Sequence, residues 1–145
     1  MFELFITIAG FIIGLGSVTV IDIHGFLGRT SSYWTEATIR THKVTKPLIW
    51  VGMWCVVLGT FLLYRGESFS FESYRVMLAL EALMIFNGCF LSFVVSPYLL
   101  QKEREGKARE ILDIRLQRKI FFSFMISFCS WWGLLLYILM QIVVS

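Results

Sequence analysis

The chain has 145 residues, of which 57% are hydrophobic and only 16% are charged. A soluble domain of this size would carry charged side chains over most of its surface, so this composition excludes an ordinary soluble protein. The formal net charge of +3 comes from short polar segments between apolar runs. This pattern indicates contact with anionic lipid headgroups and argues against nucleic acid as a partner.

Apolar runs at about residues 2–22, 47–64, 76–99 and 120–144 fill most of the chain. Each is close to the ~20 residues that an α-helix needs to cross the hydrocarbon core of a bilayer. No linker rich in Pro, Gly or Ser divides the chain, so residues 1–145 are expected to form one domain. We therefore predict an all-α polytopic membrane protein, an antiparallel bundle of four transmembrane helices.

The first run carries a stripe of small residues, Gly10, Gly14 and Ser17, on one helical face. Its GFIIG stretch is a GxxxG pair, which allows two helices to approach closely. The run has no basic region before it and no small-residue cleavage site. We expect a retained membrane anchor and not a cleaved signal peptide.

The segment between the first and second runs contains both histidines of the chain, His24 and His42, with Asp22 and Glu36 nearby in sequence. Histidine and carboxylate side chains ligate zinc and non-haem iron, and histidine ligates haem. One interpretation is therefore that His24 and His42 bind haem b or a transition metal, with Asp22 and Glu36 as further metal ligands. In the other, His42 contacts lipid headgroups and Asp22 pairs with a nearby basic side chain.

The same segment is predicted to be partly helical. Residues 35–44 (TEATIRTHKV) suit a helix for which Ser32 would be the N-cap. Pro47 either begins the second span or kinks a longer helix.

Small residues also predict packing faces on the other three runs. They are Gly52 and Gly59 on the second run, Gly88 on the third, and Ser123, Ser127 and Ser130 on the fourth. In lipid, helix interfaces are rich in such residues, and four stripes indicate one packed bundle.

Glu81 lies inside the third run, where an ionisable side chain is costly and is by default a functional candidate. Depth counting places Thr60, Tyr137 and Gln141 near the same level. These four residues are expected to form a polar pocket for a proton, a cation or a quinone headgroup. The alternative is a protonated Glu81 that holds helices together through Tyr137.

Basic residues concentrate in the first and third segments between the runs. The first segment holds Arg29, Arg40, Lys43 and Lys46, and the third holds Lys102, Arg104, Lys107, Arg109, Arg115, Arg118 and Lys119. Basic residues near span ends stay on the cytoplasmic side, so we predict that both termini lie outside. The third segment is expected to extend the two adjoining spans as helices, interrupted near Gly106.

A Gly-rich first span, a basic loop, a Pro-led second span (KPLIWVG) and a third span ending in NGCFLSFVVSP give the chain a recognisable layout. It resembles small integral membrane proteins of prokaryotes and, more remotely, copper-resistance D-like proteins and the bacterial membrane protoporphyrinogen oxidase. The resemblance implies a small helical bundle in a prokaryotic plasma membrane that uses histidine for copper or haem. Those proteins tend to carry a histidine near the start of the first span, whereas the first histidine here is His24. No ligand role is carried over.

Three functions stay open at this point. The first is a structural or accessory membrane subunit that binds other subunits or a second copy of the chain. The second is a haem-, quinone- or metal-binding redox protein that uses His24 and His42. The third is a small proton- or cation-coupled transporter or channel subunit that uses Glu81. No nucleophile paired with a base, no phosphate-binding loop and no HExxH motif marks an enzyme.

Overall fold

The computed structural model describes residues 1–66 and 69–144, and its elements are helices throughout that range. They are α1 (Phe2–Leu27), α2 (Ser32–Arg65), α3 (Phe71–Phe90), the π-helical turn η1 (Leu91–Val95), α4 (Ser96–Arg104) and α5 (Ile114–Val144). Because α3, η1 and α4 run on as one span, the described residues contain 4 helices long and apolar enough to cross a membrane. The predicted all-α fold with four membrane spans is confirmed.

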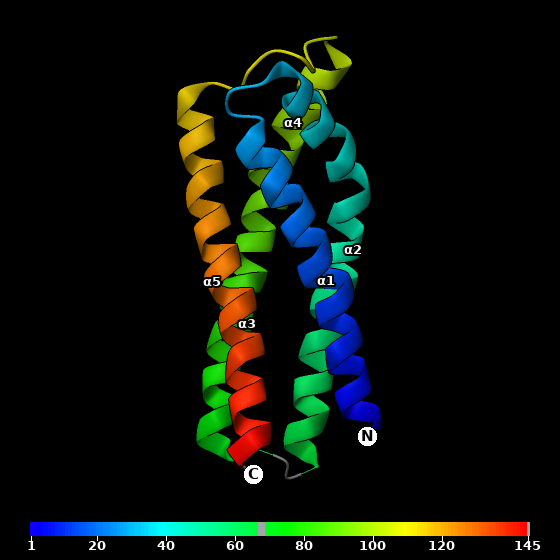
Figure 1. Cartoon of the computed structure of the whole chain (residues 1–145), viewed down its shortest axis with the longest axis vertical. Coiled ribbons are helices and arrows are strands. Elements are labelled where there is room, and N and C mark those ends of the chain that lie inside the picture. The colour runs from blue at the N-terminus through cyan, green and yellow to red at the C-terminus, as the bar shows by residue number, and fades with distance from the viewer. Residues whose placement is uncertain (67–68, 145) are drawn as a thin grey trace.

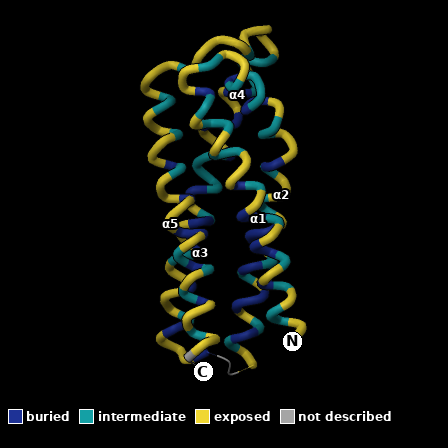
Figure 2. The backbone as a smooth tube through the Cα atoms, viewed as in Figure 1, coloured by how far each residue is buried: buried dark blue, intermediate teal, exposed yellow. Residues whose placement is uncertain are grey.

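The spans run antiparallel along one axis. Figure 1 shows both termini at one end of the bundle, with the α1–α2 and α4–α5 connections at the opposite end. Side chains that face away from the neighbouring helices are large and apolar, such as Phe86 at 77% exposure and Phe93 at 76%. Figure 2 shows the same division, with buried residues where helices face one another and exposed residues outside. This is the pattern expected when lipid surrounds the bundle.

α2 is much longer than the predicted second span. It begins at Ser32 and passes through Pro47 without ending, so the helix predicted at residues 35–44 and the span are one element. The N-cap is Ser31 and not Ser32, and its side chain makes no capping bond. Thr35 ties this end of the helix to α1, because its hydroxyl donates to the carbonyl oxygens of Gly28 (2.8 Å) and Ser31 (3.0 Å).

The predicted break near Gly106 is confirmed, but it is longer than predicted, because α5 begins only at Ile114. α4 ends at Arg104, and Gly106 adopts φ 72°, a left-handed conformation that favours glycine. The amide of Lys107 donates to the Lys102 carbonyl (2.9 Å), and the amide of Gly106 donates to the Glu103 carbonyl (3.0 Å). This pair of bonds is a Schellman motif, which satisfies the last carbonyls of the helix.

The helices associate as two pairs, α1 with α2 and α3 with α5. Glycines bring the first pair very close together: a Cβ atom on Gly10 would lie 2.7 Å from the amide nitrogen of Val56. A Cβ atom on Gly52 would overlap the backbone of Gly14, and one on Gly59 would overlap Thr7. These four glycines therefore lie where α1 and α2 approach most closely, so the small-residue stripes of these two spans are used within the monomer.

The remaining small residues divide between packing and local bonds. Ser123 donates to the Asn87 side chain (2.7 Å), and the Asn87 amide donates to the Ser123 carbonyl (3.1 Å), which joins α5 to α3. Ser130 is buried but donates to the carbonyls of its own helix, and Ser127 is buried beside it. Two further residues of the stripes are not at close helix contacts. Gly88 lies at ordinary van der Waals distance from the Trp50 ring, and Ser17 is only half-buried.

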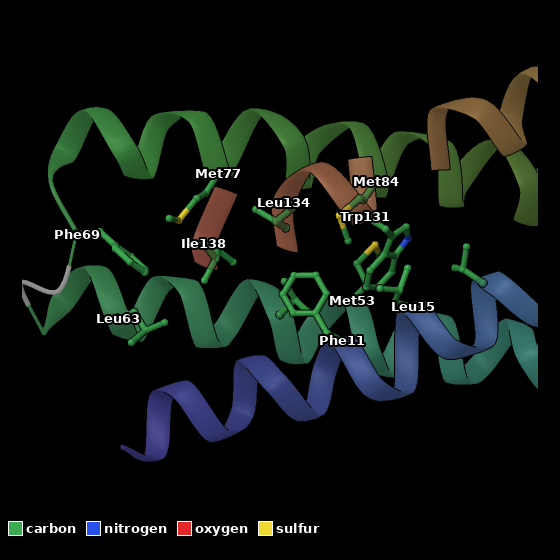
Figure 3. Close-up of a cluster of buried hydrophobic side chains, with 12 residues drawn as sticks. Phe11, Leu15, Met53, Leu63, Phe69, Met77, Met84, Trp131, Leu134 and Ile138 are labelled. Atoms are coloured by element: carbon green, nitrogen blue, oxygen red, sulfur yellow. The ribbon is translucent and has the colours of Figure 1, made fainter. Parts of the chain in front are cut away.

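An apolar cluster joins the two helix pairs. In Figure 3, Trp131 of α5 lies among Leu15, Met53 and Met84. Its ring also meets Phe11 edge-on, with ring centroids 6.1 Å apart. Side chains from all four spans therefore meet at one level of the bundle.

Candidate binding cavity

A cavity of about 100 Å³ lies between the four spans, in the half of the bundle that carries the α1–α2 and α4–α5 connections. A cavity of about 150 Å³ holds a benzene ring, so a ring of that size would enter this smaller cavity only if the side chains of its wall moved outward. Most of its wall is apolar or aromatic, formed by residues that include Ile21, Phe26, Trp50, Leu91, Phe121 and Phe124. The polar groups of the wall are few, and each of them is placed by a local feature of the fold.

The turn η1 supplies one of these polar groups. Its backbone hydrogen bonds join residues five positions apart: the amide of Ser96 donates to the Leu91 carbonyl. In this register the next amide would belong to residue 97 and would donate to Ser92, but Pro97 has no N–H. The Ser92 carbonyl is thus left without a helical partner. Lys46 supplies the missing donor, because its Nζ donates to the Ser92 carbonyl at 3.5 Å and also to the Ser96 hydroxyl at 3.4 Å.

Trp50 fixes the side chain of the same serine. Its indole Nε1 donates to the Ser92 Oγ at 3.1 Å. Trp50 lies four residues after Lys46 on α2, so one face of that helix presents both donors to η1. The serine hydroxyl keeps its own hydrogen for a further acceptor.

His42 faces the cavity one turn earlier on α2. Its Nε2 atom is buried and has no hydrogen-bond partner among the described residues. A buried polar atom without a partner costs about 1–3 kcal/mol, so almost all such atoms in folded proteins are paired with protein, water or a ligand. His42 Nε2 is therefore a candidate hydrogen-bonding position beside the cavity.

Asp22 lines the cavity from α1, opposite α2. In the described part of the chain, no cation forms an ion pair with its carboxylate. Arg29, also on the wall, lies over the rings of Phe26 and Phe121 instead, at 5.6 and 5.5 Å from their centroids. The cavity therefore offers a carboxylate, an imidazole nitrogen and an ammonium group within a largely apolar wall.

The two histidines do not share the cavity. The Nδ1 atom of His24 lies 3.1 Å from the Thr41 hydroxyl, and its ring packs on Trp34 with centroids 5.2 Å apart. His24 is not among the residues that line the cavity. The arrangement does not present His24 and His42 to one haem.

The predicted four-residue metal set is not assembled either. Glu36 is held by two arginines: its carboxylate lies 2.6 Å from Arg40 Nη2 and 2.7 Å from Arg109 Nε. In residues 1–66 and 69–144, no group of three or more His, Cys, Asp or Glu side chains is placed to hold a metal ion. The prediction placed Asp22, His24, Glu36 and His42 at one depth, but only Asp22 and His42 line the cavity, whereas His24 contacts Thr41 and Glu36 is paired with arginines.

The α4–α5 connection closes the end of the cavity. Arg109 reaches Glu36 of α2, and Lys43 pairs with Glu103 at 2.7 Å. The carboxylate of Glu36 raises the pKa of the Arg109 guanidinium through their hydrogen bond and opposite charges. Just beyond these pairs, Leu112 and Gln117 line the cavity. Ion pairs between segments distant in sequence therefore hold this connection over the site.

The predicted polar pocket around Glu81 is assembled only in part. Thr60 Oγ1 lies 2.5 Å from Glu81 Oε1, so these two side chains meet as expected. Gln141 instead accepts a hydrogen bond from Ser73 at 2.7 Å, and Tyr137 packs against the apolar cluster. Glu81 is joined to α2 and not to the polar groups of α5.

Sequence reasoning missed Lys46, Trp50 and Ser92 as site residues. The sequence holds one indication of these residues, which is that Pro97 lies five positions after Ser92. This spacing leaves the Ser92 carbonyl without a backbone donor only when the turn between them is π-helical. Comparison of the chain with known protein families, curated proteins and solved structures found no match.

Proposed function

We propose that the protein binds a small amphipathic molecule of the quinone class in this cavity. The observation that carries the proposal is the buried, unpartnered Nε2 atom of His42 in a mostly apolar wall. A quinone ring is flat and largely apolar, and its carbonyl oxygens require donors. His42 in its Nε2–H form is such a donor.

The remaining polar groups suit both redox states of such a ring. Lys46 and the Ser92 hydroxyl are further donors for a carbonyl oxygen, and the carboxylate of Asp22 is an acceptor for the hydroxyl of a quinol. Aromatic side chains such as Phe121 and Phe124 offer faces against which a ring packs. Binding sites for small molecules commonly combine such walls with a few placed polar groups.

This proposal is favoured over the two closest alternatives. A haem held by two histidines would need His24 on the cavity wall, and His24 packs on Trp34 instead. A purely structural subunit would use its small-residue stripes for partner spans, but Gly10, Gly14 and Gly52 are used inside the monomer. Neither alternative accounts for the unpaired His42 nitrogen.

The test is a binding titration in lipid nanodiscs. Decylubiquinone is added while tryptophan fluorescence is recorded, because a quinone close to Trp50 quenches its emission. Quenching is expected to saturate in the wild type. His42→Ala should weaken binding by about three- to ten-fold, the loss expected for one net hydrogen bond. His24→Ala is the matched control and should leave binding unchanged, since its ring lies outside the cavity.

Two results would reject the proposal. One is quenching that rises linearly with quinone, as it would for simple partition into the lipid. The other is a saturable curve that is the same in the wild type and in His42→Ala.

We further propose an orientation in the plasma membrane of a prokaryote, with both termini outside. The two more basic connections, α1–α2 and α4–α5, share one end of the bundle, and this supports a cytoplasmic position for that end. The cavity would then open toward the cytoplasmic half of the bilayer.

A further inference from the structure

Glu81 is a second buried polar centre, separate from the cavity. It lies on α3 about two turns before Gly88, where the cavity wall begins on that span. Only 2% of its surface is exposed, and Met77 and Met84, one turn away on either side of the same face, are buried as well. In the described residues, no cation forms an ion pair with it.

The hydroxyl of Thr60 has one hydrogen to donate. Its oxygen lies 3.1 Å from the Val56 carbonyl and 3.0 Å from the Val57 carbonyl, which are acceptors only. All three contacts of Thr60 are satisfied together when this hydrogen points back to the backbone of α2, as is common for threonine in membrane helices.

The contact between Thr60 and Glu81 then needs a hydrogen from the acid. A carboxylate would place two acceptor oxygens together, whereas a carboxylic acid donates to Thr60 Oγ1 and completes a chain that ends on the α2 carbonyls. The surroundings agree, because a carboxylate in an apolar interior without a cation is far costlier than the neutral acid.

We propose that Glu81 is an intramembrane proton-binding site, in which the neutral acid donates to Thr60. The bond joins α2 of one helix pair to α3 of the other. Release of the proton would leave an uncompensated charge between the pairs. Deprotonation should therefore require that α2 and α3 move apart and admit water. This inference does not depend on the quinone proposal, since it uses other residues.

Infrared spectroscopy tests it directly, because a protonated carboxylic acid has a C=O stretching band that ionised carboxylates lack. At neutral pH the wild type should show such a band, shifted on exchange into D₂O. In an Asp22→Asn background, which removes the other acid that lines an apolar wall without an ion pair among the described residues, Glu81→Gln should abolish the band. Glu72→Gln is the matched control and should keep it, because Glu72 is exposed and paired with Arg75. Asp22→Asn should also keep it.

Thr60→Val provides a second measurement that keeps Glu81 in place. Loss of the hydrogen-bond acceptor should move the band to higher frequency without removing it. The proposal is overturned if the wild type has no such band, or if the band survives in Glu81→Gln when Asp22 is also replaced by Asn. It is also overturned if the band is unmoved by Thr60→Val. If Glu81→Gln does not fold, the Thr60→Val shift alone decides.

Discussion

A missing amide hydrogen at Pro97 organises the polar wall of the cavity. The π-helical register directs the Ser92 carbonyl toward residue 97, and proline cannot donate to it. Lys46 satisfies the carbonyl, and Trp50 holds the side chain of the same serine. π-helical turns inside α-helices often occur at functional sites, and here the turn explains why two donors of α2 face one residue of the third span.

At the same scale, the glycines of the α1–α2 contact can be tested individually. Gly52→Ala should lower the thermal stability of the protein, because the added methyl would overlap the Gly14 backbone and the helices must separate. Overpacking of this kind costs about 1–3 kcal/mol. Stability is measured by size-exclusion chromatography after heating.

Gly16→Ala is the control for Gly52→Ala. A Cβ atom at Gly16 meets nothing within 4 Å, and alanine is the better helix former, so no loss is expected. Equal stability of the two variants would show that the close contact does not exist.

Residue roles that depend on local sequence could be predicted, whereas roles that depend on distant partners could not. The glycine stripes could be predicted because close approach of helices requires small residues, whatever the fold. The bonds of Glu36 could not, because its partner Arg109 is 73 positions away and nothing local indicates it. The role of Ser92 depends on a change of helical register that the apolar pattern does not encode.

At the scale of elements, the helices are longer than the apolar runs that predicted them. Hydrophobicity marks only the part of each helix that lies in the hydrocarbon, whereas α2 continues through the polar stretch from Ser32 to Pro47. The break at Gly106 could be predicted, because glycine between two charged helical segments favours a left-handed helix end.

Gly106→Ala tests this helix end. Because nothing lies within 4 Å of a Cβ atom there, the expected effect comes only from its φ of 72°, which costs an L-residue roughly 1–2 kcal/mol. Hydrogen exchange of the Lys107 amide, which is bonded to Lys102, should become faster. Gly106→Asn should show a smaller change, since asparagine tolerates this conformation. Unaltered exchange in the alanine variant would argue against the Schellman motif.

At the scale of the whole molecule, the protein consists of two helix pairs joined by a limited set of contacts. The sequence predicted four packing stripes and one bundle but not this pairing, because a stripe does not specify which helix it meets. The Thr60–Glu81 bond and the cluster around Trp131 connect the pairs. Trp131 fits because Gly14 leaves room for its ring.

Trp131→Ala should therefore destabilise the bundle strongly. Only 2% of Trp131 is exposed, and its removal would leave a cavity where all four spans meet. We expect a loss of about 2 kcal/mol or more, less than in a water-soluble core because lipid removes part of the hydrophobic term. Trp132→Ala is the control, since this neighbour is 44% exposed and faces outward. Comparable losses in both variants would contradict the assignment of Trp131 to the junction.

Photolabelling tests the central claim, the quinone-class ligand in the cavity, most directly. A photoreactive benzoquinone with a short alkyl tail is bound in nanodiscs, activated by light, and its attachment sites are mapped by mass spectrometry. Labels are expected on cavity residues such as Leu91, Phe121 and Phe124, and excess decylubiquinone should prevent them. Labels confined to lipid-facing residues such as Phe86 and Phe93, or unaffected by competitor, would contradict the claim.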